Sequence, residues 1–151
     1  SSAASDVYKR QVKNKNEYQN LEIQRFIERH SLNDFKMNPH FPVISLQIIR
    51  GAVAAEMDGF LEEYIDKVLV HMWEEPKKMD DPEVIKAAFE ESGFDAEKLM
   101  AQMQDAEVKS KLISNTEAAV ERGVFGIPTF FVGEEMFFGK DTLWQVEELL
   151  K

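Results

Sequence analysis

The chain of 151 residues has 44% apolar and 30% charged residues, a composition typical of one soluble globular domain with its own core. Its net charge of −10 disfavours nucleic-acid binding, because a phosphate backbone attracts basic surfaces. The chain has no Cys, no signal-peptide pattern at its start and no apolar run near the roughly 18 residues of a membrane helix. We therefore expect a cytoplasmic protein that contacts neither nucleic acid nor membrane.

The first third of the chain predicts one helix. Residues 1–12 are small, polar and then basic without a sustained period, which indicates a disordered or non-native tail. Apolar residues recur at helical spacing from Glu17 to His30 and predict an amphipathic helix. Residues 35–37 alternate in polarity, so a short strand is one interpretation of that segment.

The central part of the chain predicts several helices, at about 45–58, 60–74, 82–92, 95–103 and 105–122. Asp81 and Asp95 are expected to be N-caps, and Gly59, Gly93 and Gly123 fit helix ends. Residues 56–121 carry 18 acidic and 7 basic side chains. Because this charge follows helical periodicity, we interpret it as solvated helix faces.

The period changes after Gly123. Residues 129–132 are β-branched or aromatic, and residues 136–138 repeat that character after a Gly-containing turn. This pattern predicts a β-hairpin. A final helix is expected from about Asp141 to Leu150.

The histidines do not form a recognisable metal motif. His30, His40 and His71 lie far apart, without an i, i+4 pair and a third ligand, so we predict no metal site. His71 is interpreted as a residue at the boundary of an apolar stripe, and His40 as a loop residue. The sequence also lacks the GxSxG motif of nucleophile elbows, the P-loop motif and the GxGxxG motif of dinucleotide-binding folds.

Pro128 stands at the entry to the first predicted strand, where it cannot donate a ladder hydrogen bond. If the Ile127–Pro128 bond is cis, the chain turns sharply and the backbone N–H and C=O of Ile127 face outward. Such an edge can pair with an extended, peptide-like ligand, and Gly126 leaves room for its approach. The alternative is a trans proline that only begins the strand, which base rates alone favour. We predict the cis bond, because Pro128 lies between a helix that ends in Gly and an aromatic strand.

Two segments carry a family resemblance, GVFGIPTFFVGEEMFFGKD at residues 123–141 and HFPVISLQIIRGAVAAE at residues 40–56. Together they resemble the glutathione-dependent branch of the DsbA-like proteins, which contains 2-hydroxychromene-2-carboxylate isomerases and kappa-class glutathione transferases. The resemblance implies an α/β, thioredoxin-like fold with a large inserted helical region. It implies a single thioredoxin-like domain at 13–151, with a helical insertion at about 44–122 and a C-terminal β-β-α unit at about 127–150.

The resemblance also implies a function. Glutathione would be the cofactor of an isomerase that acts on small aromatic substrates of the 2-hydroxychromene-2-carboxylate type, and a homodimer is expected. The glutathione-binding residues implied are Ile127, Pro128, Lys140 and Asp141. Where Lys140 stands, the family usually has a small polar residue. For Asp141 the alternative is an N-cap of the last helix.

The chain also departs from the family pattern. Family members carry a serine near their N-terminus that contacts the glutathione sulfur, whereas Ser1, Ser2 and Ser5 lie in the atypical tail and the other serines lack the motif. The chain therefore resembles an N-terminally truncated member with no assigned catalytic residue. We expect no isomerase turnover by this chain and glutathione binding no tighter than about millimolar. Open alternatives are a kappa-like transferase, a DsbA-family disulfide oxidoreductase and a non-catalytic helical binding module.

Overall fold

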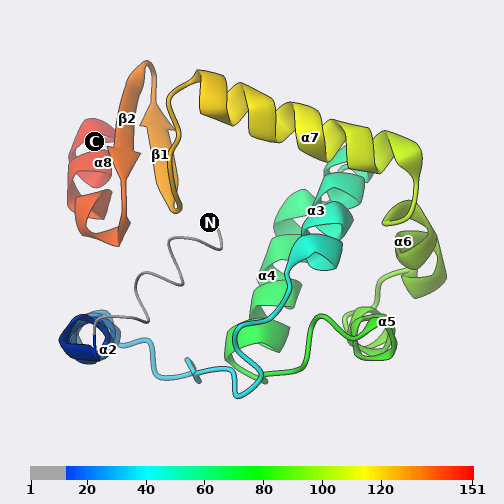
Figure 1. The fold of residues 1–151 in the computed structure, drawn as a ribbon, viewed down its shortest axis with the longest axis horizontal. Coiled ribbons are helices and arrows are strands. Elements are labelled where there is room, and N and C mark those ends of the chain that lie inside the picture. Colours follow the sequence, from blue (N-terminus) through cyan, green and yellow to red (C-terminus); the bar gives the residue numbers. More distant parts are fainter. Residues whose placement is uncertain (1–12) are drawn as a thin grey trace. The chain divides into compact units, whose positions relative to one another are not determined.

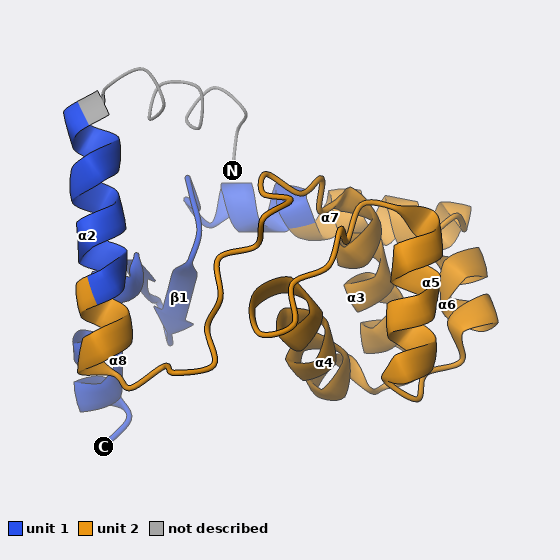
Figure 2. Ribbon diagram, turned by 90° about the horizontal axis from the view of Figure 1, so that it is seen from below, with its two compact units in different colours: residues 1–24, 116–151 blue, residues 25–115 orange. Residues whose placement is uncertain are grey.

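The structure is a computed structural model that describes residues 13–151, so the prediction for residues 1–12 lies outside the described residues. The described residues fall into two compact units (Figure 2). The helical unit consists of residues 25–115, and the sheet unit consists of residues 13–24 and 116–151. Helices α2 (Lys13–Arg29) and α7 (Ala106–Glu121) each contribute to both units.

The helical unit contains the helices predicted from the central part of the chain (Figure 1). Besides the start of α7, they are α3 (Leu46–Asp58), α4 (Leu61–Trp73), α5 (Pro82–Glu91) and α6 (Ala96–Gln102). The two predicted N-caps are confirmed, because an Asp81 carboxylate oxygen accepts from the N–H of Glu83 and one of Asp95 accepts from that of Lys98, each at 3.0 Å. Among the described residues, none of the helices is both long and apolar enough to cross a membrane.

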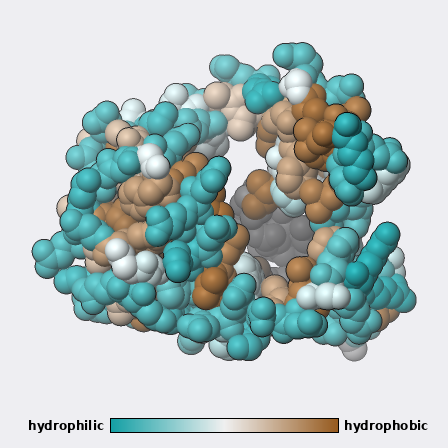
Figure 3. Space-filling view, turned by 180° about the vertical axis from the view of Figure 1, so that it is seen from behind, coloured by the Kyte–Doolittle hydropathy of each residue, from teal (hydrophilic) through white to brown (hydrophobic). Residues whose placement is uncertain are grey.

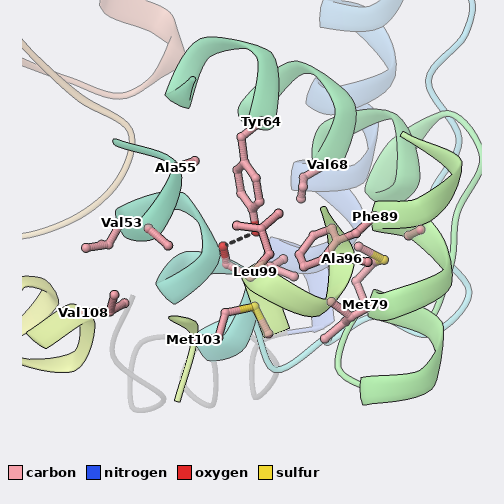
Figure 4. Close-up of a cluster of buried hydrophobic side chains, with 14 of the residues drawn as sticks. Val53, Ala55, Tyr64, Val68, Met79, Phe89, Ala96, Leu99, Met103 and Val108 are labelled. Carbon is pink, nitrogen blue, oxygen red and sulfur yellow. Dashed lines mark hydrogen bonds between the residues drawn. The ribbon is translucent and has the colours of Figure 1, made fainter. Parts of the chain in front are cut away.

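The core of the helical unit is centred on Tyr64 (Figure 4). Its ring lies 5.7 Å from that of Phe89, and its hydroxyl donates to the Ile48 carbonyl at 2.7 Å. Gly51 is buried beside this ring, and a Cβ at that position would lie 2.8 Å from Tyr64 Cζ. The packing of α3 against α4 therefore requires a residue without a side chain.

The segment before α3 differs from the prediction. Residues 35–37 form no strand, because the Lys36 N–H donates to the carbonyl of Trp73 at the end of α4 and no neighbouring strand is present there among the described residues. The Phe35 ring stacks on Trp73 at 5.7 Å. The structure also has a cis bond at Phe41–Pro42, which the sequence did not suggest.

The sheet unit contains the predicted hairpin. Strands β1 (Thr129–Val132) and β2 (Glu135–Phe138) pair antiparallel, with Thr129 opposite Phe138 and Val132 opposite Glu135. After β2 a short 3-10 helix, η1 (Lys140–Thr142), precedes α8 (Leu143–Leu149). The last helix thus begins two residues later than predicted. Figure 1 shows α8 beside the hairpin.

Large apolar side chains are exposed on the sheet unit, which contributes the brown atoms at the upper right of Figure 3. Several of them belong to the loop before β1, to β2 and to the C-terminal segment from α8 on: Phe125, Ile127, Phe138, Trp144, Leu149 and Leu150. Single exposed apolar residues are ordinary on protein surfaces, but a group of them is typical of a binding or packing surface.

Candidate functional site

The loop between α7 and β1 makes the turn that the sequence suggested. The Ile127–Pro128 bond is cis, as expected. The Thr129 hydroxyl donates to the Gly126 carbonyl at 2.7 Å and closes the loop locally. A Cβ on Gly126 would lie 2.8 Å from the Phe138 ring, so this glycine permits close approach of the neighbouring strand. The space left by Gly126 is thus filled by Phe138, whereas the sequence had suggested that it admits a ligand.

The backbone on one side of β1 points away from the hairpin. The Gly139 N–H donates to the Pro128 carbonyl at 2.9 Å, which continues the ladder beyond β1. Because hydrogen-bonding groups alternate in direction along a strand, the N–H and C=O of Thr129, next to Pro128, face away from β2. Among the described residues no strand pairs with that side of β1. Ile127 is 71% exposed beside this edge, which therefore has the geometry to pair with an extended ligand.

The four predicted site residues gather at one end of the hairpin. Gly139 is hydrogen-bonded to Pro128, and the next two residues in the chain are Lys140 and Asp141. These two residues therefore lie at the same end of the hairpin as Ile127 and Pro128. The Lys140 ammonium donates to an Asp141 carboxylate oxygen at 2.6 Å, and the Asp141 side chain is 82% exposed. An exposed pair of this kind contributes little to stability, so the carboxylate can exchange its partner for a ligand cation.

Asp141 does not cap the last helix. Thr142 is the N-cap residue of α8, and its side chain makes no capping hydrogen bond. Instead the Thr142 hydroxyl donates to the Gly139 carbonyl at 2.8 Å and stabilises the turn into η1. The Asp141 carboxylate contacts Lys140, so the capping alternative raised from the sequence is wrong.

Aromatic side chains beside the loop were not singled out from the sequence. Phe125 is 72% exposed, and its ring packs against that of Phe138 with the ring centroids 4.7 Å apart. The Arg122 guanidinium lies 3.5 Å above the centre of the Phe131 ring, a cation–π contact. The aromatic residues that flank the Gly-Ile-Pro-Thr segment on both sides were the sequence feature that could have indicated this aromatic surface. This surface offers an apolar ligand an aromatic contact.

The histidines lie in other surroundings. His30 and His40 are exposed, but His71 is only 4% exposed, so the interpretation of His71 as a boundary residue is wrong. His71, Glu75 and Glu91 form one group of potential metal ligands among the described residues, with ligand atoms within 4.8 Å of one another. The Lys77 ammonium lies 2.7 Å from His71 Nδ1 and 2.6 Å from a Glu91 oxygen, so a side-chain cation already occupies that cluster.

Known proteins resemble this chain over most of its length. The DSBA-like thioredoxin domain family matches residues 2–151. A 2-hydroxychromene-2-carboxylate isomerase from Pseudomonas putida is 30% identical over 87 residues, which are 58% of this chain and 43% of that protein. Human (Homo sapiens) glutathione S-transferase kappa 1 is 28% identical, covering 74% of this chain and 57% of that protein.

A solved structure supports the same assignment. The structure of a 2-hydroxychromene-2-carboxylate isomerase superposes with a TM-score of 0.79 at 25% identity, covering 91% of this chain and 66% of that one. The chain spans about half the length of the curated relatives it matches. These matches confirm both the family resemblance and the thioredoxin-like fold expected from the sequence.

Proposed function

This chain belongs to the DSBA-like thioredoxin domain family, and we propose that it acts with glutathione in the isomerisation of aromatic substrates of the 2-hydroxychromene-2-carboxylate type. The observation that supports this most strongly is the exposed Ile127 before the cis Pro128, at the unpaired edge of β1 and near the exposed carboxylate of Asp141. Related proteins named as isomerases and as a glutathione transferase supply the chemical class. Residues 13–151 have no assigned catalytic side chain, so the proposal for this chain concerns binding.

Each part of the tripeptide has a matching group. The cysteinyl residue of glutathione has one backbone N–H and one C=O, which pair with those of Ile127 as in a short antiparallel ladder. The α-ammonium of the γ-glutamyl residue donates to Asp141, in a charge-assisted bond that replaces the Lys140 ammonium. The displaced Lys140 ammonium then lies close to the γ-glutamyl α-carboxylate and can form an ion pair with it. A small polar residue, which the family usually has at this position, would not supply that positive charge.

Glutathione held at this site would supply a thiolate nucleophile for reversible addition to the conjugated system of the substrate. The chain itself orients the tripeptide through the β1 edge and the η1 turn. Phe125 and Phe138 provide an exposed aromatic surface near that edge, and an aromatic substrate would pack against it. The polar contacts proposed here come from the Ile127 backbone and from the exposed Lys140–Asp141 pair alone, so we expect a dissociation constant of about 1 mM.

The Asp141 contact is testable with a single substitution. We expect Asp141→Asn to weaken glutathione binding by about tenfold, because the amide keeps the shape but loses the charge that attracts an α-ammonium. Isothermal titration of glutathione into each protein measures the effect. Glu134→Gln is the matched control, since Glu134 lies in the turn at the other end of the hairpin. Equal binding by Asp141→Asn and the unmodified chain would contradict the assignment of Asp141.

A kappa-like glutathione transferase is the second candidate, favoured by the 74% coverage in the match to the human kappa-class protein. The two functions share the glutathione site and differ in the electrophile. Because the proposal for this chain concerns binding, titration of the glutathione-saturated chain with a hydroxychromene carboxylate and with a halonitrobenzene separates them by which of the two electrophiles binds. A dithiol oxidoreductase would need cysteines, and this chain has none.

A further inference from the structure

His71, in the last turn of α4, has a defined protonation state in this structure. Its Nδ1 lies 2.7 Å from the Lys77 ammonium, and its Nε2 lies 2.8 Å from the Ser92 hydroxyl oxygen. An ammonium can only donate, so Nδ1 must accept and Nε2 must carry the ring proton. The Ser92 hydroxyl in turn donates to the Ala88 carbonyl at 2.8 Å. His71 is therefore a neutral imidazole whose two nitrogens are both hydrogen-bonded.

The charges facing the ring come from three directions. The positive charge of Lys77, in the loop after α4, disfavours protonation of the His71 ring. The negative charges of Glu91, in α5, and of Glu75 favour its protonation. The Lys77 ammonium also donates to a Glu91 oxygen at 2.6 Å, which neutralises part of that attraction. Burial has the largest effect and Lys77 adds to it, so the pKa of His71 lies below its usual 6.5.

The residue that contacts His71 also holds a distant loop. The Lys77 N–H donates to the His71 carbonyl at 2.8 Å, and the Lys77 carbonyl accepts from the Asn38 side-chain amide at 2.9 Å. The same amide donates to the Met72 carbonyl at 3.1 Å, and the Asn38 side-chain oxygen accepts from the His40 N–H at 2.9 Å. Asn38 is 2% exposed, so this buried amide ties residues 38–41 to the end of α4 and to Lys77.

We propose that His71 is a pH-sensitive latch for the loop at residues 36–42. A proton gained at Nδ1 removes the acceptor for Lys77 and places two cations 2.7 Å apart, so the Lys77 side chain must leave. Movement of residue 77 weakens the bond between its carbonyl and the Asn38 amide. The Asn38 amide is then held by the Met72 carbonyl alone, the loop keeps only that bond and the bond of the Lys36 N–H to the Trp73 carbonyl, and it opens more often.

The direction of the pH dependence follows from the lowered pKa. The folded chain binds a proton at His71 less readily than the unfolded chain does. The latch is therefore closed above pH 6.5, and its contribution to stability is lost as the pH falls from 6.5 through the lower pKa of the folded state.

Hydrogen exchange of the full chain, read residue by residue with NMR, tests the latch. We expect the protection of the His40 and Lys77 amides, corrected for the intrinsic pH dependence of exchange, to fall several-fold as the His71 ring signal titrates. In His71→Gln, a neutral amide can accept from Lys77 and donate to Ser92, so protection should stay constant over that range. In Asn38→Ala, protection of His40 should be low at every pH while His71 still titrates.

Two further variants keep the proposal falsifiable. His40→Gln removes the other titratable ring in the loop and must leave the pH dependence in place. If His71→Gln does not fold, Lys77→Met serves instead, because it should raise the pKa of His71 and leave the loop poorly protected even at neutral pH. Unchanged loop protection while His71 titrates in the unmodified chain, or the same fall in His71→Gln, would overturn the latch.

Discussion

At the scale of single residues, the contact between Gly51 and Tyr64 is a strong constraint on the helical unit. A methyl group at position 51 would overlap the Tyr64 ring and its hydroxyl, which donates to the Ile48 carbonyl. Burial also raises the pKa of that hydroxyl, so it remains a donor at neutral and mildly alkaline pH. We expect Gly51→Ala to destabilise the unit by about 1–3 kcal/mol, measured by urea unfolding.

A double-mutant cycle identifies the cause of that loss. Tyr64→Phe removes the hydroxyl oxygen, the atom closest to the added methyl group, so Gly51→Ala should cost less in the Tyr64→Phe background. Strictly additive free energies of unfolding would show that the overlap with Tyr64 is not the cause.

Local residues were predictable where the signal is local. The Gly-Ile-Pro-Thr segment placed the turn at Ile127–Pro128 because the constraint acts on adjacent residues. The burial of His71 was not predictable, since its partners Lys77 and Ser92 lie 6 and 21 residues away in the sequence. For Asp141 the reason is different: its partner Lys140 is the adjacent residue, but the sequence did not show that the turn at η1 would direct the carboxylate to Lys140 and not to the start of α8.

At the scale of elements, the helix caps make a quantitative prediction. An Asp81 carboxylate oxygen accepts from the Glu83 N–H at the start of α5. We expect Asp81→Ala to lower the free energy of unfolding by about 1 kcal/mol, because one N-terminal amide loses its partner. Glu90→Ala, an exposed change in the same helix, is the control and should alter stability far less. Equal losses in the two variants, measured by urea unfolding, would mean that the cap contributes nothing specific.

The periodicity of apolar residues and the capping residues predicted the helices correctly, whereas the strand predicted from alternation at residues 35–37 does not form. Helices α3 to α7 were predictable because apolar stripes and capping residues act within each helix. Alternating residues at 35–37 form a strand only if a neighbouring strand supplies hydrogen bonds, and here the Lys36 amide bonds to the end of α4. A period of two residues is therefore insufficient without a pairing partner.

At the scale of the whole molecule, the acidic charge and the proposed binding site belong to different parts of the chain. Residues 56–121 hold 18 of the 28 acidic side chains, whereas the loop and hairpin that carry the site lie at 122–141. The family and its fold were predictable from the short motif around Pro128, because the motif joins a helix end, a loop and a strand in one order. The division into two compact units was not predictable, since no Gly- or Pro-rich linker marks it in the sequence.

Glutathione is expected to bind at the edge beside Ile127 and at the η1 turn. An NMR titration of the isotope-labelled chain with reduced glutathione tests it most directly, through the backbone amides of Ile127, Thr129 and Asp141. We predict shifts at these amides that saturate with a dissociation constant of about 1 mM, and no matching shifts at the Glu134 turn. Shifts confined to other residues, or no shifts at all at millimolar glutathione, would contradict the account.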